Sequence, residues 1–408
     1  MGIVRGALAG MLLWCGMTVH ASELHGEAEF VLGTGSGQTG STQTGLGKND
    51  FDGAVDPWRN SSATLTIQTQ LFDEISGWVT FSADGERSQV LDVQEAWLAW
   101  KPVPSGPWRT RIRLGSFFPP TSLEIEPNSP SWKPVRTLSS SAINTWIGEE
   151  LRSNGLELAF SRRGLMIGSP HDFDFTLAAI SANDPAGTLL AWRGWTFGDR
   201  ITGLTETLRL PDLPVYRPDG PIPRQTRNVR EFRDIDGVPG YYASASYTYA
   251  HTVQVSFLHY DNEGHPLDVV QGQYSWETRF NHLSVQVLLP AGWEILSQAI
   301  QGTTLMGADA VHVRFRALYL LASHPFGPGD LTLRWDLFRT QDIDLLPTDP
   351  NSEHGNALAL AYRLPLGKQL HWVSEFLWVD STRAAHILLG EPTRAIERSL
   401  STALRWDF

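Results

Sequence analysis

Three arginines alternate along one short segment of the chain. In "WRTRIRLGSF", Arg109, Arg111 and Arg113 are separated by the single residues Thr110 and Ile112. Alternate side chains of an extended strand point to the same face and lie about 6.6–6.8 Å apart. The three guanidinium groups are therefore predicted to form a ladder of positive charge on one face, which attracts anions wherever water reaches it.

The segment that follows, residues 117–150, carries opposite charge. Its charged residues are Glu124, Glu126, Lys133, Arg136, Glu149 and Glu150. Its larger apolar residues, which could pack it against a wall, include Trp132, Ile143, Trp146 and Ile147. Carboxylates opposite an arginine ladder would create a field that orders water and favours small polar solutes. In the alternative, the arginines pair with neighbouring acids such as Asp92 or Glu157 and are structural.

A second unusual segment extends over residues 182–239. Its arginines could collect anions, and they are Arg217, Arg224, Arg227, Arg230 and Arg233. Trp192, Arg193 and Trp195 could form a stacking platform for a sugar or an aromatic solute, or they could anchor the segment by packing. A connection of this length is usually functional, although a surface flap of mixed charge is the alternative.

Sequence motifs for catalysis and metal binding are scarce. The chain lacks GxSxG, HExxH and GxxxxGK[ST]. "DIDG" at residues 234–237 is a fragment of a calcium loop without its third acid or distal glutamate. His259 with Asp261, or His354 with Glu353, could supply an acid/histidine pair, but their spacing supports neither. We therefore predict no enzyme activity, no metal site and no cofactor.

The first 21 residues have the features of a secretory signal peptide. Arg5 precedes an apolar run, and Val19-His20-Ala21 is a small-x-small cleavage site that makes Ser22 the first mature residue. The single cysteine, Cys15, lies inside this peptide. The mature chain, residues 22–408, is therefore predicted to be exported and to contain neither disulfides nor thiol-bound metal.

Composition excludes two further classes of protein. The chain has 408 residues and a formal net charge of −12, which argues against binding to nucleic acid. Beyond the signal peptide, no apolar run reaches the roughly 18 residues that a transmembrane helix needs.

Segments of about 8–12 residues with two-residue alternation recur along the whole mature chain, which is the pattern of a transmembrane β-barrel. "LTLRWDLF" predicts an outward face of Leu331, Leu333, Trp335 and Leu337. At the chain's end, "LSTALRWDF" predicts an outward face of Leu400, Thr402, Leu404, Trp406 and Phe408. Aromatic residues near strand ends, Trp97 and Trp100 among them, are expected at the lipid boundary.

Two further segments are assigned in the same way. In "VHVRFRALYL" we expect an outward face of Val311, Val313, Phe315 and Tyr319 and an inward face of Arg314 and Arg316. In "VVQGQYSWETRF" we expect Tyr274, Trp276 and Phe280 outward and Gln271, Gln273, Glu277 and Arg279 inward. The apolar parity changes after this segment, which predicts a β-bulge near Asn281-His282.

Counting strands from both ends gives a barrel of about 16 strands, with 18 as the alternative. Short turns such as "LGK", "HPFGPG" and "PAG" alternate with long loops. This rhythm predicts an antiparallel barrel with short periplasmic turns and long outer loops. A barrel of 16 strands is too wide for side chains alone to fill and leaves an aqueous channel.

The signal peptide, the loop rhythm and the terminal aromatic residue together resemble a Gram-negative outer-membrane porin. The stretch "RIRLGSFFPPTSLE" is also similar to part of the phosphate-selective porins, although the lysine clusters typical of those porins are missing. The resemblance implies that residues 117–150 fold into the lumen and form the constriction. It also implies that Trp406 and Phe408 are recognised by the barrel assembly machinery.

The sequence thus predicts an all-β outer-membrane channel for small hydrophilic solutes, with anionic solutes among the candidates. Outer-membrane lipid, lipopolysaccharide and the assembly machinery are the expected partners, with a homotrimer as the expected assembly. The alternatives are a closed barrel that serves as an adhesin or assembly scaffold, and an outer-membrane hydrolase with its site at the barrel rim.

Overall fold

The structure is a computed structural model that describes residues 21–51, 61–85, 87–125, 132–344 and 346–408. Residues 1–20 of the expected signal peptide and Glu126 of the expected constriction lie outside these ranges. The predictions made for them therefore remain predictions.

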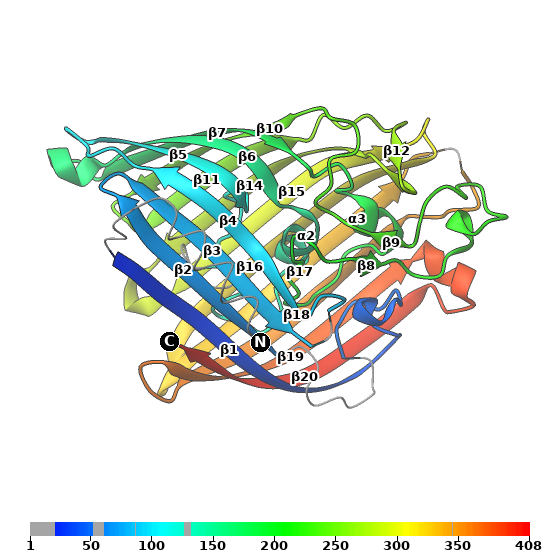
Figure 1. The fold of residues 1–408 in the computed structure, drawn as a ribbon. Helices are drawn as coiled ribbons and strands as arrows, with labels where there is room; N and C mark the ends of the chain where they lie inside the picture. The colour runs from blue at the N-terminus through cyan, green and yellow to red at the C-terminus, as the bar shows by residue number, and fades with distance from the viewer. Residues whose placement is uncertain (1–20, 52–60, 86, 126–131, 345) are drawn as a thin grey trace, which may run out of the picture.

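Strands dominate the described chain and close into one barrel (Figure 1). Neighbouring strands pair antiparallel, and β1 pairs with β20 to close the sheet. The barrel strands are β1 (Ala21–Ser36), β2 (Ser62–Phe72), β3 (Ile75–Asp84), β4 (Leu91–Trp100), β5 (Trp108–Phe117), β6 (Ser153–Arg162), β7 (His171–Ser181), β10 (Gly240–Tyr249), β11 (Val253–Asp261), β14 (Glu277–Leu288), β15 (Glu294–Met306), β16 (Val311–Phe326), β17 (Gly329–Asp342), β18 (Glu353–Pro365), β19 (Leu370–Arg383) and β20 (Arg394–Asp407). The prediction of a 16-stranded antiparallel barrel is confirmed.

The two ends of the barrel differ in their connections. Short turns join the strands at the end on the left of Figure 1, where β1 begins and β20 ends. Long connections at the other end hold α2 (Ala142–Glu150), α3 (Thr188–Trp192), η1 (Ser41–Gln43), η3 (Pro214–Tyr216), η5 (Ala384–Leu389) and the strand pairs β8 (Leu208–Arg209) with β9 (Asn228–Val229) and β12 (Val269–Val270) with β13 (Gln273–Tyr274). The turn helices are η2 (Gly164–Ile167) and η4 (Pro290–Gly292). We call the two ends the short-turn end, which is periplasmic in such barrels, and the long-loop end.

The alternation predicted for β17 and β20 is confirmed. On β17 the outward residues Leu331 to Leu337 are 37% to 46% exposed, whereas Arg334 and Asp336 are buried inside. On β20, Trp406 is exposed and Arg405 is buried. Barrel closure pairs the backbone of every strand, so this apolar outer surface can lie in a bilayer. Barrels of this architecture lie in the outer membrane.

The two faces of β16 alternate, but their predicted inward and outward orientation is wrong. Val313, Phe315 and Tyr319 are almost fully buried inside the barrel, whereas Arg314 and Arg316 are exposed on its outer wall. Val311 is buried as well. The polarity of the two faces is therefore inverted toward the long-loop end.

The inward and outward faces predicted for residues 269–280 are wrong as well. Phe280 and Trp276 are buried, and Arg279 points outward. Gln271, Gln273 and Tyr274 lie at the β12–β13 hairpin and not on a barrel strand. β14 pairs with β11 and β15 without a register shift, so no bulge occurs at Asn281-His282. The parity of apolar residues changes because the environment inside the barrel changes along the strand.

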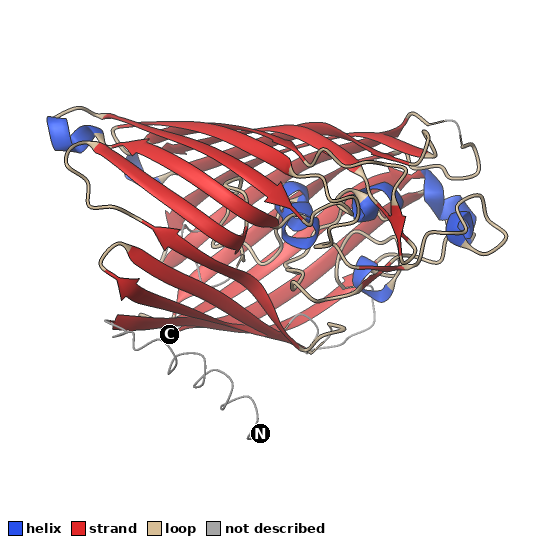
Figure 2. Ribbon diagram, turned by 45° about the horizontal axis from the view of Figure 1, so that its top comes forward, coloured by secondary structure: helices blue, strands red, loops and turns tan. Residues whose placement is uncertain are grey.

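That environment is a hydrophobic core inside the lumen. α2 and α3 lie within the barrel outline in both ribbon views (Figure 2). The main core cluster combines inward residues of β7, β10, β11 and β14–β19 with residues of α2 and of the segment 186–201. Of the helices in the described ranges, none combines the length and the hydrophobicity that a membrane-spanning helix requires.

Candidate channel and its lumenal loops

The described part of the third long loop, residues 118–125 and 132–152, folds into the lumen as the resemblance implied. Its helix α2 begins after Ser141, whose hydroxyl accepts a hydrogen bond from Asn144 N–H at 3.3 Å. Every residue of α2 is buried. Because α2 is buried on all sides, contacts with the surrounding barrel wall and loops hold it in place.

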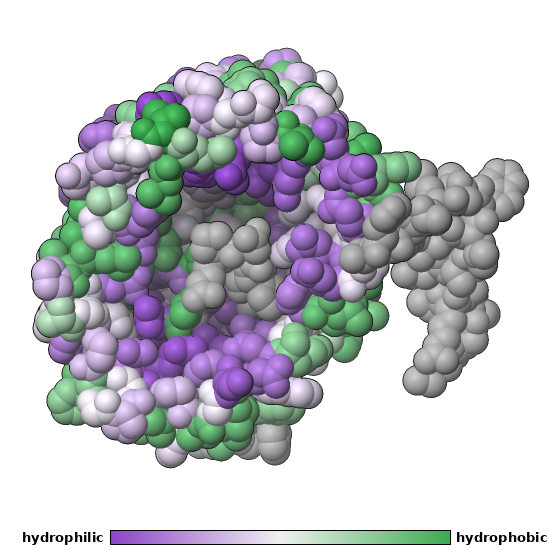
Figure 3. Space-filling view, turned by 90° about the vertical axis from the view of Figure 1, so that its left-hand side faces the viewer, coloured by the Kyte–Doolittle hydropathy of each residue, from purple (hydrophilic) through white to green (hydrophobic). Residues whose placement is uncertain are grey.

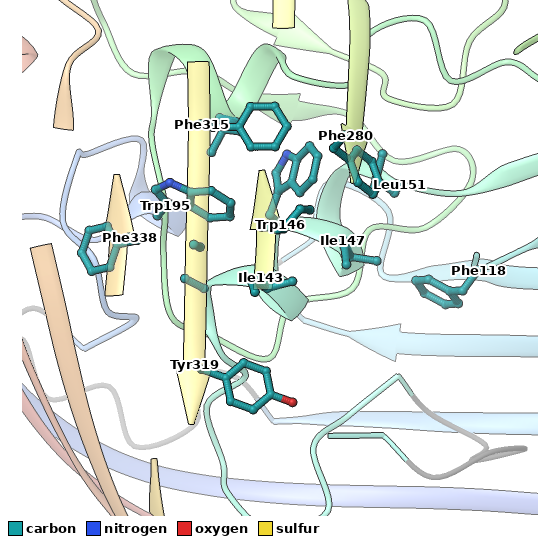
Figure 4. Packing of buried hydrophobic residues seen from close by; sticks show 14 of the residues in the cluster. Phe118, Ile143, Trp146, Ile147, Leu151, Trp195, Phe280, Phe315, Tyr319 and Phe338 are labelled. Carbon is teal, nitrogen blue, oxygen red and sulfur yellow. The ribbon is translucent and has the colours of Figure 1, made fainter. Parts of the chain in front are cut away.

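Aromatic packing fixes α2 against the wall (Figure 4). The Trp146 ring lies 5.5 Å from the Phe280 ring of β14 and 5.1 Å from the Phe315 ring of β16. Trp195, from the next long loop, packs on Trp146 at 6.0 Å. These contacts explain why β14 and β16 turn aromatic residues inward.

The third loop reaches deep toward the short-turn end. Arg136 pairs with Glu294 at 3.0 Å and Asp330 at 3.4 Å, and both acids stand at the short-turn ends of their strands. Lys133 pairs with Glu29 at 2.6 Å and also contacts Asp199. Lys133 and Arg136 therefore anchor the loop to the wall and to the neighbouring loop.

Glu124 faces away from the arginine ladder. Its carboxylate accepts hydrogen bonds from Ser141 N–H at 3.0 Å and from Asn144 Nδ2 at 2.8 Å. It also lies 3.6 Å from the buried Arg334 of β17. The structure thus does not bring Glu124 opposite Arg111 and Arg113.

The ladder itself faces the lumen and pairs with a strand carboxylate. Arg111 and Arg113 lie 3.0 Å and 2.9 Å from the two oxygens of Glu157 on β6. The Arg113 guanidinium also stacks over Phe117 at 3.9 Å, and Arg113 is buried. Arg109 is exposed and has no carboxylate within ion-pairing distance among the described residues. The alternative that named Glu157 therefore describes both Arg111 and Arg113, whereas Arg109 has no such partner among the described residues.

A water-accessible hollow remains beside the ladder. It has a volume of about 300 Å³ and lies between the third loop and the walls formed by β3–β5 and by β10, β11 and β14. Its polar lining includes Arg111, Arg113, Glu95, Gln94, Ser246, Gln254, Ser256 and Ser284. Figure 3 shows the barrel from the short-turn end, where hydrophilic residues surround a central hollow and hydrophobic residues lie outside.

Two tryptophans that the sequence did not mark as functional also line this hollow. The Trp78 and Trp97 rings are stacked 5.4 Å apart and almost parallel, and the Arg113 guanidinium lies 5.5 Å from Trp97. The expectation that Trp97 lies at the lipid boundary is therefore wrong. A register shift between Thr80 and Phe81 of β3 lies next to this stack. Such an irregularity cannot be read from alternation alone.

The fourth long loop, residues 182–239, is largely folded into the barrel as well. Trp192 and Trp195 are at most 1% exposed, and Arg193 is 6% exposed. Trp192 packs on Tyr216 and Trp276, and Arg193 pairs with Glu149 at 2.9 Å. The trio is therefore placed as an anchor and presents no free ring face to solvent.

Glu150 joins the two inserted loops. Its carboxylate accepts hydrogen bonds from the backbone N–H groups of Gly187 at 3.2 Å, Leu189 at 2.7 Å and Leu190 at 3.2 Å, at the start of α3. Trp146 Nε1 donates to the same carboxylate. Burial raises the pKa of Glu150 to about 7, although these donors favour the ionised form.

The long loop exposes part of its positive charge at the long-loop end. Arg224 and Arg230 are exposed. Arg227 lies 3.2 Å from Asp212, and Arg233 donates to Gln273 at 3.2 Å. Arg217 also lies 3.2 Å from Asp212. Of the five arginines, Arg224 and Arg230 therefore have no ion-pair partner among the described residues, whereas Arg217 and Arg227 contact their own loop and Arg233 contacts the β12–β13 hairpin.

The "DIDG" segment acquires a third acid from the beginning of the same loop. Carboxylate oxygens of Asp184, Asp234 and Asp236 lie within 4.8 Å of one another. Asp184 accepts hydrogen bonds from the N–H groups of Ile235 and Asp236. Burial raises the pKa of Asp184 to about 6. These contacts join the beginning and the end of the loop.

The first long loop, which joins β1 to β2, also contacts the inner wall of the barrel. Lys48 is fully buried and pairs with Glu353 of β18 at 2.5 Å, and Arg383 of β19 pairs with the same acid at 3.1 Å. Glu353 points inward and His354 is exposed outside, so these neighbours form no acid/histidine pair. His259 instead contacts Asn281 Oδ1 at 2.9 Å.

The terminal aromatic residues lie on the outer wall at the short-turn end. The Trp406 and Phe408 rings are 4.8 Å apart and exposed. Phe408 N–H donates to Gly26 O at 2.9 Å, which ties the last residue to β1.

No protein-family model matches the sequence, and no curated protein matches it either. Solved structures share its fold at low identity. The outer-membrane channel DcaP of Acinetobacter baumannii matches with a TM-score of 0.56 at 10% identity, over 95% of this chain and 97% of that one. The anion-selective porin of Comamonas acidovorans matches with a TM-score of 0.53 at 11% identity, over 95% and 99%. OmpT of Vibrio cholerae in its trimer form matches with a TM-score of 0.52 at 7% identity, over 95% and 99%. The chain therefore has the fold of outer-membrane porins, and that sequence prediction is confirmed.

Proposed function

We propose that the chain is a passive outer-membrane channel for small hydrophilic solutes, with a weak preference for anions. The observation that carries this proposal is the polar hollow beside Arg111 and Arg113, enclosed in a closed 16-stranded barrel. A wide barrel that retains a hydrated passage lets small polar solutes cross the membrane.

The charge balance of the hollow favours anions. Arg111 and Arg113 line the hollow, and the Arg111 side chain is 40% exposed, whereas Glu95 is the one acid among the described lining residues. A solute in the hollow therefore meets more accessible positive charge than negative charge. One of the channels with the same fold is an anion-selective porin, which is consistent with this reading.

The same proposal includes roles for the outer vestibule, the terminal aromatic residues, the signal peptide and the trimeric assembly. The exposed Arg224 and Arg230 form an outer vestibule that gathers anions. Trp406 and Phe408 form the signal for the barrel assembly machinery. Export depends on the signal peptide 1–21. The chain associates as a homotrimer in a lipopolysaccharide-containing membrane, as the solved trimer of Vibrio cholerae OmpT suggests for this fold.

A second candidate function rests on the interlocked loops. Lys48, Glu149 and Glu150 tie three loops to one another and to the wall through buried polar contacts. A barrel closed in this way would serve as an adhesin or an assembly scaffold. The rim hydrolase receives no support from the geometry of His354 and Glu353, which lie on opposite faces of β18.

Conductance in planar bilayers under a salt gradient tests the proposal. We expect open channels whose reversal potential indicates a modest anion preference. The absence of conductance from correctly folded, heat-modifiable protein would refute the channel and favour the closed barrel.

A further inference from the structure

The outer wall of the barrel carries an arginine cluster near the long-loop end. Arg314 and Arg316 of β16 and Arg339 of β17 are exposed outside the barrel, as is His354 of β18. Arg316 is the register partner of Arg339, which is in turn the partner of His354. Register partners on one face have Cβ atoms about 4.5–5.5 Å apart, so these side chains form one continuous patch.

The cluster lacks internal counterions. None of the described carboxylates lies within ion-pairing distance of Arg314, Arg316 or Arg339. Two other outward arginines are paired, since Arg279 lies 3.3 Å from Glu277 and Arg394 lies 2.8 Å from Asp380, whereas the isolated outward Arg398 of β20 has no ion-pair partner among the described residues. Adjacent like charges on a sheet repel each other, so an external anion would stabilise the patch.

An apolar groove begins directly below the patch. It has a volume of about 960 Å³, and its polar upper edge includes Arg316, Arg339 and His354. Its apolar outward residues are Phe257, Leu283, Ala299, Leu318 and Leu337. Leu283, Ala299 and Leu318 are register partners, and the small Ala299 leaves space between the two larger side chains.

The patch lies at the boundary of the lipid-facing band. The outward residues of β17 are apolar from Leu331 to Leu337, and Arg339 is the next outward residue. Leu331 and Arg339 are about 27 Å apart along the strand, or roughly 20 Å along the membrane normal once the usual strand tilt is included. The apolar band of such barrels is about 25 Å tall, so Arg339 lies near the headgroup level of the leaflet at the long-loop end.

We propose that this patch and groove bind a phosphorylated lipid of the outer leaflet, with phosphate on Arg316 and Arg339 and an acyl chain in the groove. Guanidinium groups match phosphate oxygens with paired hydrogen bonds. In a phosphorylated lipid the charged headgroup lies above the acyl chains. The arginines above the apolar groove have the same order. A second copy of the chain placed on this patch by a two-fold axis would bring like charges together.

Native mass spectrometry of the purified barrel in detergent tests this site. The probes are lipid A with two phosphates and lipid A with its phosphates removed. We expect the intact protein to bind the phosphorylated probe at least about tenfold more tightly, and the double variant Arg316→Gln/Arg339→Gln to lose that preference. Arg394→Gln is the matched control, because it removes an outward arginine that is already paired, and it should keep the preference.

Several results would contradict the lipid-binding site, and some of them would identify a different ligand or partner. Equal affinity for both probes, or an unchanged preference in the double variant, would overturn the proposal. Displacement of the lipid by excess inorganic phosphate would show a free-phosphate site instead. A change of oligomeric state in the double variant, measured by light scattering, would show that the patch contacts another copy. Heat-modifiable migration of every variant establishes that the barrel has folded before binding is compared.

Discussion

Replacing Arg109 and Arg111 together by glutamine should shift the channel toward cations without unfolding the barrel. Arg109 is exposed, and the Arg111 side chain is 40% exposed beside the hollow. Arg113 is different, because it is buried between Phe117 and Glu157. The double variant therefore removes accessible charge and keeps the pair that holds β5 to β6.

The size of the shift follows from screened electrostatics. A unit charge about 7 Å from a passing ion contributes about 0.6 kcal/mol in water, or about 0.3 kcal/mol after screening at 0.1 M salt. That energy changes the local concentrations of anions and cations by about 1.6-fold each, in opposite directions. Two removed charges should therefore lower the anion-to-cation permeability ratio about sevenfold.

Reversal potentials across a planar bilayer with a salt gradient measure this ratio. Arg162→Gln is the matched control, because Arg162 is the register partner of the outward Trp108 and lies on the outer wall of β6. We expect the control to behave like the intact protein. An unchanged ratio in Arg109→Gln/Arg111→Gln would refute the idea that the ladder faces the permeation path.

Three further predictions concern the loops and the terminus. Trp146→Ala removes contacts with Phe280 and Phe315, weakens loop docking by about 3–5 kcal/mol and should raise single-channel conductance in a barrel that still folds. Because the raised pKa of Glu150, about 7, disfavours its ionised form in the docked loop, docking should weaken as pH rises from about 4.5 to 7. Conductance should then increase over that range, and a Glu150→Gln channel that keeps the full pH response would contradict this. Phe408→Ala should reduce barrel yield in membranes while export continues, whereas Phe326→Ala, an exposed aromatic of a short turn, should not.

The barrel could be predicted from sequence because most of its strands meet lipid on one side and polar groups on the other. β17 shows this clearly, since Trp335 faces outward and Arg334 faces inward. The rule failed where Phe280 and Phe315 turn inward to pack on Trp146. Alternation reports that the two faces differ, and it does not report which face is inside.

The sequence predicted that the third loop lies in the lumen, but it did not predict which charged residues pair there. The third loop enters the lumen, yet Glu124 pairs with Arg334 and not with the ladder. Likewise, Asp184 joins Asp234 and Asp236 only after the long loop folds. Such partners are distant in sequence, so residue spacing contains no information about them.

The inverted polarity of β16 connects the filled lumen to the outer wall. Because Phe315 must face the inserted loops, its neighbours Arg314 and Arg316 must face outward. Packing inside the barrel therefore places unpaired cations at the lipid boundary outside. A loop change that removed the need for inward aromatic residues would also remove the constraint that keeps these arginines outside. The lumenal plug and the proposed lipid site are for this reason expected to depend on the same strand.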